Sequence, residues 1–334
     1  MQSTFEGENS LEQPLTIVIV AWNTRELLHR CLQSLENVSP ELRTQVVVVD
    51  NASSDGTVDM VRDRFPWVEL IASDRNLGFG AANNLAFSRA SGEHVLLLNP
   101  DTQVKAGALE TMLGYLRSHP DVGVVGTTLF NPDGTLQPSC HSFYSFVDSL
   151  KHNRLVDRMT ERWKVSDAQR SGRPSDVDWM IGACLLVRGE TLLALNGFDP
   201  DFFLYAEEID LEYRIRQAGQ RVVFVPSTGV VHYGGQSARQ APVAAAFHDY
   251  RGRWLFVRKH YSTISATAYL AKTVVAIGFW LSYWGLRVAT GSHPDAGHQL
   301  RAYWQLLIWH LSDRGQPPAP RWIRQSEEMT PSTL

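Results

Sequence analysis

Four short apolar runs in the first 120 residues alternate with segments that have helical apolar spacing. The runs cover residues 15–21, 45–49, 68–72 and 94–98, and they are rich in Val, Ile and Leu. Apolar strands that alternate with helices are typical of a mostly parallel sheet with both faces covered by helices. The pattern therefore predicts an α/β fold.

Polar residues follow the carboxyl end of each of these predicted strands. In sheets of this kind, ligands bind just beyond the carboxyl ends of the strands. Four polar strand ends are therefore expected to converge on one crevice: Trp22-Asn23, Asp50-Asn51, Asp74-Arg75-Asn76 and Asn99-Pro100-Asp101.

The pattern changes after about residue 121. Shorter strands and polar loops lead to a second compact block at 177–235, which contains an acidic helix at 206–219. Beyond residue 260 the apolar spacing predicts a helical tail. The first 14 residues lack the basic stretch and apolar run of a signal peptide, so we expect a disordered leader and no export.

Charge is divided unevenly along the 334 residues. The net charge of −4 is too weak, and of the wrong sign, for a protein whose main function is to bind nucleic acid. Residues 251–334 contain ten Lys/Arg and four Asp/Glu, a net charge of +6, which leaves −10 for residues 1–250. Three widely spaced cysteines indicate neither a disulfide framework nor a zinc site, and they favour a reducing compartment.

The basic tail also contains six of the ten tryptophans and an apolar stretch at 262–286. Trp and Lys/Arg beside apolar runs are typical of segments at a membrane interface. The uncharged segment 273–286 has 14 residues, fewer than the roughly 18 to 20 that a spanning helix needs. We expect contact with the membrane interface; a helix packed on the core and a true span are the alternatives.

Asp101 follows a buried strand, where an unpaired carboxylate is costly unless it meets a cation. Mg²⁺ or Mn²⁺, held by one or two protein oxygens and by diphosphate, is the usual cation at phosphate substrates. A turn that caps the next helix is the alternative. Asp50 and Asn51 could bind a nucleobase or ribose, or could cap the helix that begins near Thr57, a role that suits Asp55 better.

Three acidic residues, Glu207, Glu208 and Asp210, lie at the start of a predicted helix. Asp210 is expected to pair with Arg214 one turn later. Successive helical residues point about 100° apart, so Glu207 and Glu208 are not expected to face one cleft in the same way. One of them could act as a general base while the other orients substrate. His232 follows an apolar strand and is either a ligand or structural.

Several enzyme classes lack their main sequence signatures. Residues 76–83 are similar to a dinucleotide-binding loop, but the third glycine is missing and no acid follows at the expected distance, which disfavours a nicotinamide dehydrogenase. The chain has no GxSxG, Walker or CxxC motif, so serine hydrolases, P-loop NTPases and zinc ribbons are disfavoured as well.

Six segments, taken together and in order, resemble the inverting family 2 glycosyltransferases with the GT-A fold, and in particular their bacterial rhamnosyltransferase-like branch. They are TIVIVAWN (16–23), VVVVDNASSDGT (46–57), NLGFGAANN (76–84), LLLNPDT (96–102), the segment 178–219 and VVHYGG (230–235). The resemblance implies a GT-A domain at 15–260, in which 15–120 is the nucleotide-sugar half and 121–260 the acceptor half. The basic helical tail at 261–334 follows this domain.

The resemblance also implies roles for individual residues. Glu208 would be the catalytic base, and Asp101 with His232 would bind Mg²⁺ or Mn²⁺ on the diphosphate. The acceptor side would include the loop near 198–205 together with Trp179, Gly182 and Glu207. The nucleotide sugar would be held by Val20, Ala21, Trp22, Asp50, Asn51, Arg75, Asn76, Gly78, Phe79, Asn83, Asn99 and Asp101.

Two positions depart from the family pattern. Asn99 stands where the metal-binding motif has its first acid, and an amide is a weaker ligand than a carboxylate. Glu208 stands where the base is normally Asp, and its side chain is one methylene longer. Catalytic groups must be placed to within a fraction of an ångström, so this length affects where the carboxylate acts.

The implied function is transfer of a sugar to a glycan or lipid-linked polysaccharide precursor, at the cytoplasmic face of the membrane. L-rhamnose from dTDP-rhamnose is the first choice of donor, and UDP-hexose or UDP-galactofuranose are alternatives. A nucleotidyltransferase would need a second strong carboxylate where Asn99 stands. A catalytically silent sugar-nucleotide-binding or scaffold protein would lack the turnover groups, whereas Asp101, Glu208 and His232 are present.

Overall fold

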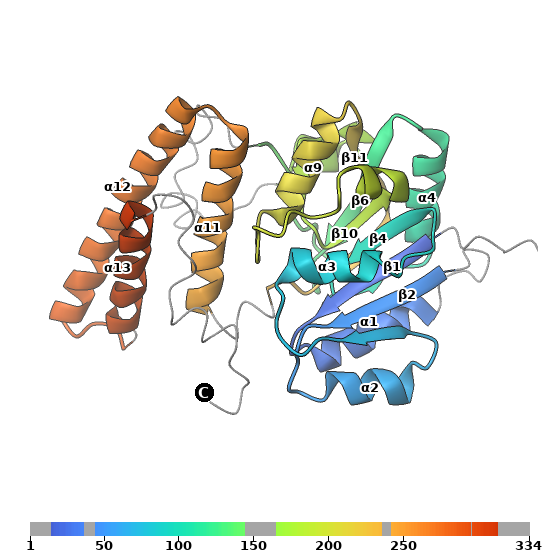
Figure 1. Ribbon diagram of the computed structural model, residues 1–334, viewed down its shortest axis with the longest axis horizontal. Coiled ribbons are helices and arrows are strands. Elements are labelled where there is room, and N and C mark those ends of the chain that lie inside the picture. Colours follow the sequence, from blue (N-terminus) through green and yellow to red (C-terminus); the bar gives the residue numbers. More distant parts are fainter. Residues whose placement is uncertain (1–14, 37–43, 144–164, 236–241, 295, 313–334) are drawn as a thin grey trace, which may run out of the picture.

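The computed structural model describes residues 15–36, 44–143, 165–235, 242–294 and 296–312. One large β-sheet flanked by helices makes up most of the molecule, and three C-terminal helices lie beside it (Figure 1). The leader 1–14, expected to be disordered, and the end of the tail, 313–334, lie outside the described residues.

The apolar runs of the N-terminal half form four parallel strands: β1 (Leu15–Ala21), β2 (Thr44–Asp50), β3 (Glu69–Ala72) and β4 (His94–Leu98). They pair in the order β3-β2-β1-β4. Every residue of β1 is buried, because helices cover both faces of the sheet and no side of this strand faces water. The predicted α/β fold is confirmed, and the strand bounds differ from the apolar runs by at most one residue.

The sheet continues through strands of mixed direction. β10 (Cys184–Arg188) pairs antiparallel with both β4 and β6 (Val122–Phe130), and β11 (Arg221–His232) runs parallel to β6. β5 (Thr102–Val104) and β8 (Ser175–Asp176) each pair antiparallel with β11. A separate two-stranded sheet joins β7 (Cys140–His141) to β9 (Trp179–Met180). This order brings the end of β11 beside the segment that follows β4.

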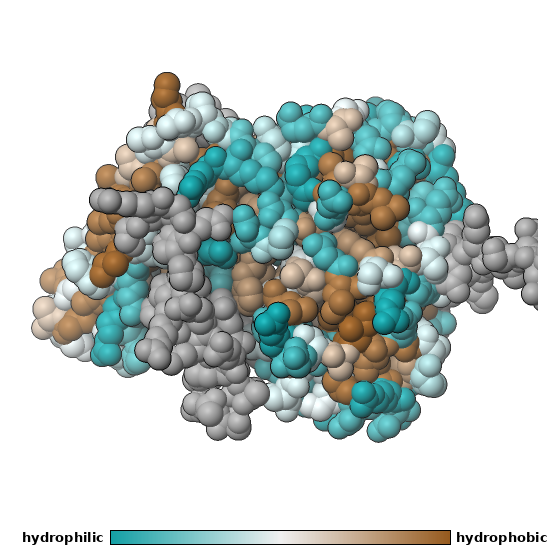
Figure 2. All heavy atoms as spheres, viewed as in Figure 1, coloured by the Kyte–Doolittle hydropathy of each residue, from teal (hydrophilic) through white to brown (hydrophobic). Residues whose placement is uncertain are grey.

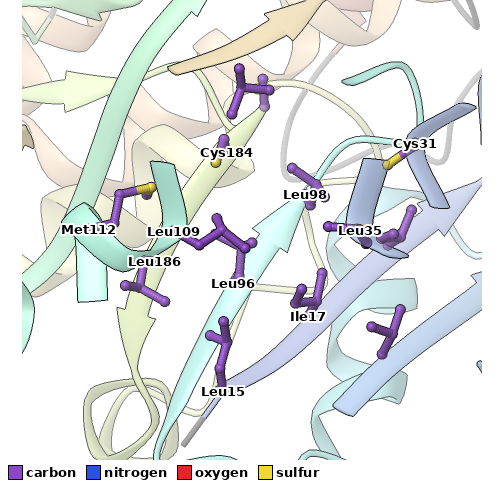
Figure 3. Packing of buried hydrophobic residues seen from close by; sticks show 14 of the residues in the cluster. Leu15, Ile17, Cys31, Leu35, Leu96, Leu98, Leu109, Met112, Cys184 and Leu186 are labelled. Carbon is purple, nitrogen blue, oxygen red and sulfur yellow. The ribbon is translucent and has the colours of Figure 1, made fainter. Parts of the chain in front are cut away.

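Helices cover the two sheet faces, and each face has its own apolar layer. The helices are α1 (Arg25–Glu36), α2 (Thr57–Arg64), α3 (Phe79–Phe87), α4 (Ala108–Ser118), α7 (Asp167–Arg170), α8 (Gly189–Ala194) and α9 (Glu207–Gln217). Helices α1, α2 and α4 pack against Ile17 and Leu96 on one face, in the layer that Figure 3 shows in part. Helices α3, α8 and α9 pack against Val18 and Leu97 on the other face. Neighbouring strand residues point to opposite faces, so each buried strand contributes to both layers.

Three helices follow the sheet: α11 (Pro242–His260), α12 (Thr263–Ala289) and α13 (Ala296–Ser312). They form a third apolar cluster, which includes Phe256 of α11, Ile277 of α12 and Trp309 of α13. The ring of Trp280 stacks on that of Tyr303, with centroids 5.7 Å apart. The predicted C-terminal helical region is confirmed. In Figure 1, α11 lies between the sheet and the outer pair α12 and α13.

Helix α12 is longer than the uncharged segment of the sequence, because it continues across Lys272 and Arg287. With 27 residues, it is the one helix in the described ranges that is long and apolar enough to cross a membrane. The length of α12 therefore does not exclude that it spans a membrane. The packing of α12 on its neighbours bears on whether it contacts the membrane interface, packs on the core or spans the membrane.

Candidate active site

A cavity of about 280 Å³ lies beyond the carboxyl ends of β1, β2 and β4. Its walls come from these strand ends, the loop before α3, the turn at 203–205, the start of α9 and one side of α11, with the end of β11 nearby. The cavity thus occupies the place where ligands bind in sheets of this kind.

Most of the residues selected from the sequence line this cavity. They are Val20, Trp22, Asn51, Asn76, Gly78, Phe79, Asn99, Asp101, Gly182, Glu207, Glu208 and His232. They come from both halves of the sheet domain, so the fold brings the strand-end residues and the acidic helix start to one place.

The remaining selected residues do not line the cavity. Ala21, Asp50 and Asn83 are buried in the fold, and the Asn83 amide donates a hydrogen bond to the Phe79 carbonyl one turn earlier. Arg75 is exposed on the loop before α3. Trp179 is buried in β9, where its Nε1 donates to the Ser142 carbonyl. The hydrogen bonds of Asn83 and Trp179 therefore stabilise the fold.

Asp101 and His232 face each other, with 3.3 Å between Oδ1 of the aspartate and Nε2 of the histidine. The antiparallel pairing of β5 with β11 sets His232 opposite Thr102, so Asp101, the preceding residue, lies beside it. The N–H of Tyr233 also donates to the Asp101 carbonyl at 2.9 Å. Sheet pairing therefore joins two residues that are far apart in the sequence.

A glutamine fixes which nitrogen of the His232 ring carries the proton. Gln137 Oε1 lies 2.7 Å from His232 Nδ1, while Gln137 Nε2 donates to Asn131 Oδ1 at 3.1 Å. Because the amide oxygen can only accept, Nδ1 must be the protonated nitrogen. In the neutral ring, the lone pair of Nε2 then points at the Asp101 carboxylate, and two acceptors this close favour a cation between them.

A divalent metal ion fits this pair. Carboxylate oxygen and imidazole nitrogen both bind such ions, and a hydrogen bond from the second ring nitrogen is how metal-binding histidines are usually oriented. Within the described ranges, no group of three or more His, Cys, Asp or Glu side chains could hold a metal ion. A metal at Asp101 and His232 would therefore need further oxygens from diphosphate and water, as Mg²⁺ and Mn²⁺ sites on phosphate substrates do.

Glu207 and Glu208 both line the cavity at the start of α9. From the helical spacing we expected Glu207 and Glu208 to face a cleft in different ways. Both residues nevertheless line the same cavity. Burial raises the pKa of Glu208 above the ordinary value. Burial and the adjacent charge of Glu208 raise the pKa of Glu207 well above it. Burial therefore favours the protonated form of both carboxyls.

Glu207 has spare hydrogen-bonding capacity. The residue is only 4% exposed, and its Oε2 has no hydrogen-bond partner in the part of the chain that the structure describes. A buried polar atom without a partner is costly, so a ligand hydroxyl in the cavity would satisfy it.

A strained turn sets the position of the two glutamates. Tyr205 and Ala206 have φ angles of 68° and 70°, which residues with a side chain rarely adopt. Gly252 of α11 packs directly against this turn, where a Cβ atom would clash with the Tyr205 carbonyl oxygen. On the other side, a Cβ at Gly182 would lie 3.3 Å from the Cβ of Glu208. Because Gly252 and Gly182 have no side chain, the backbone at these residues packs closely against the turn and against Glu208.

Asn51 organises the loop before α3. Its amide nitrogen donates to Asn76 Oδ1 at 2.9 Å, and its amide oxygen accepts from the Leu77 N–H at 2.8 Å. Asn51 therefore shapes the cavity wall as well as lining it. The alternative in which Asp50 or Asn51 caps the next helix is not what the structure shows, since Asp55 accepts from the Thr57 N–H at 3.1 Å.

Asp50 lies just behind this wall. One of its carboxylate oxygens accepts from the Ser53 N–H at 3.1 Å. The other is buried and has no hydrogen-bond partner among the residues described. Burial raises the pKa of Asp50. Asp50 does not line the cavity, and its contact with a nucleotide stays a prediction.

Asp210 is buried on the far side of the same helix. The expected pair with Arg214 is present, at 2.7 Å from Nε, and α11 adds Lys259 Nζ at 2.8 Å and His260 Nε2 at 2.7 Å. Burial alone would raise the pKa of Asp210, but the hydrogen bonds from His260 and Lys259 and the charge of Arg214 lower it to about 2. This cluster ties the catalytic end of the fold to the last turn of α11.

Sequence reasoning missed the contribution of α11. Ala244, Ala245 and His248 line the cavity, and the His248 ring stacks on Phe203 with centroids 4.8 Å apart. The local pattern of this segment mixes apolar and charged residues without a clear apolar face, so no signal within it points to a ligand. Only its packing against α9 and the turn at 203–206 brings it to the site.

Several known proteins with similar sequences are named as glycosyltransferases. A family model described as "Glycosyl transferase family 2" matches residues 16–177. The N-acetylglucosaminyl-diphospho-decaprenol L-rhamnosyltransferase of Mycobacterium tuberculosis is 30% identical over 262 residues, which cover 74% of this chain and 85% of that protein. Rhamnosyltransferase WbbL of Escherichia coli is 28% identical over 231 residues, which cover 67% of this chain and 84% of that protein.

Two solved structures share the fold. The mannosyltransferase PcManGT of Pyrobaculum calidifontis, in complex with GDP-Man and Mn²⁺, superposes with a TM-score of 0.53 at 18% identity, covering 92% of this chain and 89% of that one. GalNAc-T7 with UDP, GalNAc and Mn²⁺ superposes with a TM-score of 0.53 at 14% identity, covering 92% of this chain and 57% of that one. At these identities the similarity is one of fold.

Proposed function

Because the chain belongs to glycosyl transferase family 2 and has the GT-A fold, we propose that it transfers L-rhamnose from dTDP-rhamnose to a lipid-linked glycan precursor, with inversion at the anomeric carbon. The choice of sugar rests on the two sequence relatives, which are both named as rhamnosyltransferases. UDP-hexose and UDP-galactofuranose are the alternative donors.

One observation carries the proposal: Asp101, His232 and Glu208 line a single cavity beyond the strand ends. A sugar nucleotide needs a cation at its diphosphate and a base near its anomeric carbon, and these residues offer both in one place. Trp22 and Asn51 on the same wall would contact the nucleoside, in line with the binding position at the ends of such strands.

Asp101 and His232 would hold Mg²⁺ or Mn²⁺. Such an ion, when bound, supplies the positive charge that stabilises a departing diphosphate. Gln137 supports this role, because it keeps the proton on Nδ1 of His232 and leaves Nε2 able to bind metal. The two solved structures that share the fold are both complexes with Mn²⁺.

Glu208 would act as the general base. As the acceptor oxygen attacks the anomeric carbon, its proton passes to Glu208 and the bond from that carbon to the diphosphate oxygen breaks. A single displacement of this kind inverts the configuration. The raised pKa suits the role, because a carboxylate whose pKa is nearer to neutral is a stronger base. Glu207, whose Oε2 has no hydrogen-bond partner among the described residues, would form a hydrogen bond with a substrate hydroxyl.

The acceptor and the place of reaction are proposed together. The relative from M. tuberculosis is named for a diphospho-decaprenol acceptor, which is a membrane lipid. A lipid-linked acceptor would bring the chain to the cytoplasmic face of a membrane as a peripheral protein. Gly182 and the turn at 203–205, which line the cavity beside Glu208, would contact the acceptor sugar.

Release of nucleoside diphosphate from a panel of sugar nucleotides, with and without Mn²⁺, tests the proposal. We expect dTDP release from dTDP-rhamnose that requires Mn²⁺ and rises with a lipid-linked acceptor, and a product of inverted configuration by NMR. Preference for another sugar nucleotide would replace the donor. Binding of sugar nucleotides without turnover of any donor would identify a silent binding protein, and pyrophosphate release from a nucleoside triphosphate would identify a nucleotidyltransferase.

A further inference from the structure

An uncharged stripe runs along the outer face of α12. It extends over 22 positions, about 33 Å, and its residues lie within an arc of about 120° around the helix. All of them are exposed: Ile264, Thr267, Ala271, Val275, Phe279, Ser282 and Leu286. The large side chains are unusually open for apolar residues, with 84% of Ile264, 72% of Val275 and 64% of Leu286 exposed.

The opposite face of α12 is packed against protein. Thr273 and Ile277 are buried there, and Trp280 stacks on Tyr303 of α13. In its most apolar window of 18 residues, only 17% are buried. Figure 2 shows this apolar surface along the outer edge of the molecule, over α12. An exposed face of this length that is mostly apolar, with Thr267 and Ser282 as the polar members of the stripe, marks an interaction surface.

Charge favours lipid as the occupant of this surface. Residues 251–312 contain seven Lys/Arg and one acidic residue, Asp295, and two of the seven cations are already paired, Arg253 with Asp249 and Lys259 with Asp199 and Asp210. Lys272 and Arg287 each directly follow a stripe residue, so their charged ends can reach phosphate groups while the stripe contacts acyl chains. A second copy of the chain would bring two basic surfaces together, whereas an anionic leaflet complements them.

Packing favours a helix that lies along the membrane over one that crosses it. A spanning α12 would carry Lys272 into the hydrocarbon region, which is costly. It would also have to leave α13 and expose Tyr303 and Leu306, which are now buried. When the stripe alone enters the interface, the packed face of α12 stays intact.

We propose that the α12 stripe is a docking surface for anionic membrane lipid, on which α12 lies in the plane of the interface. The inference rests on the proposed membrane location of the transfer reaction and gives that location a surface. Lys259 and His260, at the end of α11, are bonded to Asp210 of α9. A membrane-bound α12 would therefore hold the cavity at a fixed place relative to the lipid surface.

Two double variants of the full chain test the stripe by co-sedimentation with vesicles of phosphatidylcholine and phosphatidylglycerol. Val275→Glu with Phe279→Glu places two charges in the stripe. Leu193→Glu with Trp67→Glu makes the same change at exposed apolar residues of the sheet domain, and is the control. We expect the stripe variant to lose about ten-fold or more in vesicle affinity and the control to bind like the parent.

Further measurements separate the possible outcomes. Parent binding should require phosphatidylglycerol and weaken with salt, and carbonate at high pH should release it. Turnover of the donor in solution should be equal in all variants, so that loss of lipid binding is distinct from failure of the proposed reaction. Ile264→Glu with Leu286→Glu repeats the test at the ends of the stripe if the first pair unfolds.

Three results would overturn the proposal. Vesicle binding by both stripe variants at the parent's affinity would assign lipid contact to another surface. Bound protein that resists carbonate would indicate a spanning helix. A parent that ignores vesicles but forms a dimer, which the stripe variants dissociate, would identify a second copy as the occupant. Removing residues 262–334 is a poorer test, because α12 and α13 complete the apolar cluster of α11.

Discussion

Single residues decide where protons and cations can lie in the cavity. Gln137 is the least obvious of them, because it does not line the cavity and reaches it through hydrogen bonds to the ring and the carbonyl of His232. By keeping the proton on Nδ1, it leaves Nε2 facing Asp101 Oδ1. The proposed metal site therefore depends on a residue of the loop after β6 as well as on its two ligands.

We expect Gln137→Leu to lower Mn²⁺ affinity by about 10-fold to 100-fold, the usual effect of losing the partner of a metal-binding histidine. Titration of donor turnover with Mn²⁺ measures this. Gln103→Leu is the control for Gln137→Leu, since Gln103 accepts from the Tyr233 hydroxyl and not from His232. Unchanged Mn²⁺ dependence in Gln137→Leu would remove the proposed role of His232.

Asp101→Ala should abolish metal-dependent turnover and weaken binding of the sugar nucleotide more than of the bare nucleoside.

The two adjacent glutamates should respond differently to the same substitution. Glu208→Gln is expected to keep donor binding and to lower the rate of transfer by roughly 10²-fold to 10⁴-fold, as for other positioned general bases. Glu207→Gln should cost less, because the proposed role of Glu207 is a hydrogen bond to substrate, and an amide keeps that capacity. Single-turnover transfer rates and donor affinities give both quantities. A larger rate loss in Glu207→Gln would exchange the two roles.

The expected pH dependence of the transfer rate follows from the burial of Glu208. The pKa of Glu208 is raised, so the rate should increase with pH through a limb that lies above the ordinary range of carboxyl groups. The base is active only when ionised, and this fixes the direction. A pH–rate profile of the parent enzyme that is flat down to pH 4.5 would contradict it.

At the scale of elements, α11 holds the strained turn from which α9 begins. Gly252 is the point of closest approach, because its missing side chain leaves room for the Tyr205 carbonyl. Tyr205 and Ala206 keep their positive φ angles only while their surroundings enforce them. The position of Glu208 thus depends on a helix that lies beyond the residues matched by the family model.

We expect Gly252→Ala to lower kcat by about 10-fold to 100-fold, the size of effect that a displacement of catalytic groups by about an ångström produces. Donor KM should change less than kcat, because the nearest atoms that a Cβ at Gly252 would meet belong to the turn before α9. Gly278→Ala in α12 is the matched control: a Cβ there meets nothing within 4 Å, and it should retain activity and gain slightly in helix stability. Equal kcat in the two variants would show that α11 does not position the turn.

At the scale of the whole molecule, the Asp210 cluster joins the sheet domain to the C-terminal helices. The carboxylate is fully buried and bonded to Arg214, Lys259 and His260. Two of these three partners come from α11, so the cluster links the family 2 glycosyltransferase fold to the helices that carry the proposed lipid surface. Breaking it should affect stability more than a surface ion pair does.

Asp210→Asn should lower the free energy of unfolding at pH 7 by about 2 kcal/mol, the equivalent of its lowered pKa. Arg214 and Lys259 lose the charge of Asp210, although Lys259 keeps its ion pair with Asp199. The folded-state pKa is lowered to about 2, so this contribution is present above the ordinary pKa near 3.8 and is lost as the pH falls toward 2. Urea unfolding at several pH values measures it. The difference between parent and variant should shrink below pH 4.

Asp167→Asn provides the control for this measurement. Asp167 pairs with Arg170 on the surface, where both side chains are exposed, and such pairs contribute about 0 to 1 kcal/mol. A loss in Asp210→Asn no larger than in Asp167→Asn would mean that α9 and α11 are held together by apolar packing alone.

Local patterns determined much of this protein from the sequence. Continuous apolar runs give β1, β2 and β4 almost residue by residue, because a strand with both faces buried needs an apolar side chain at every position. The ion pair of Asp210 with Arg214 follows from helical spacing. The order of short motifs, from the first strand to His232, was enough to identify the family, since each motif is a run of neighbouring residues.

Tertiary structure alone decided how distant segments meet. Gln137 contacts His232 because the loop after β6 and the end of β11 lie side by side, and no periodicity links residues 95 positions apart. The same holds for Gly252 and Tyr205, for the cavity wall formed by α11, and for the shared cavity of Glu207 and Glu208. The α12 stripe is also a tertiary result. Apolar spacing marks the helix, but only its packing on α13 determines which of its apolar faces stays open.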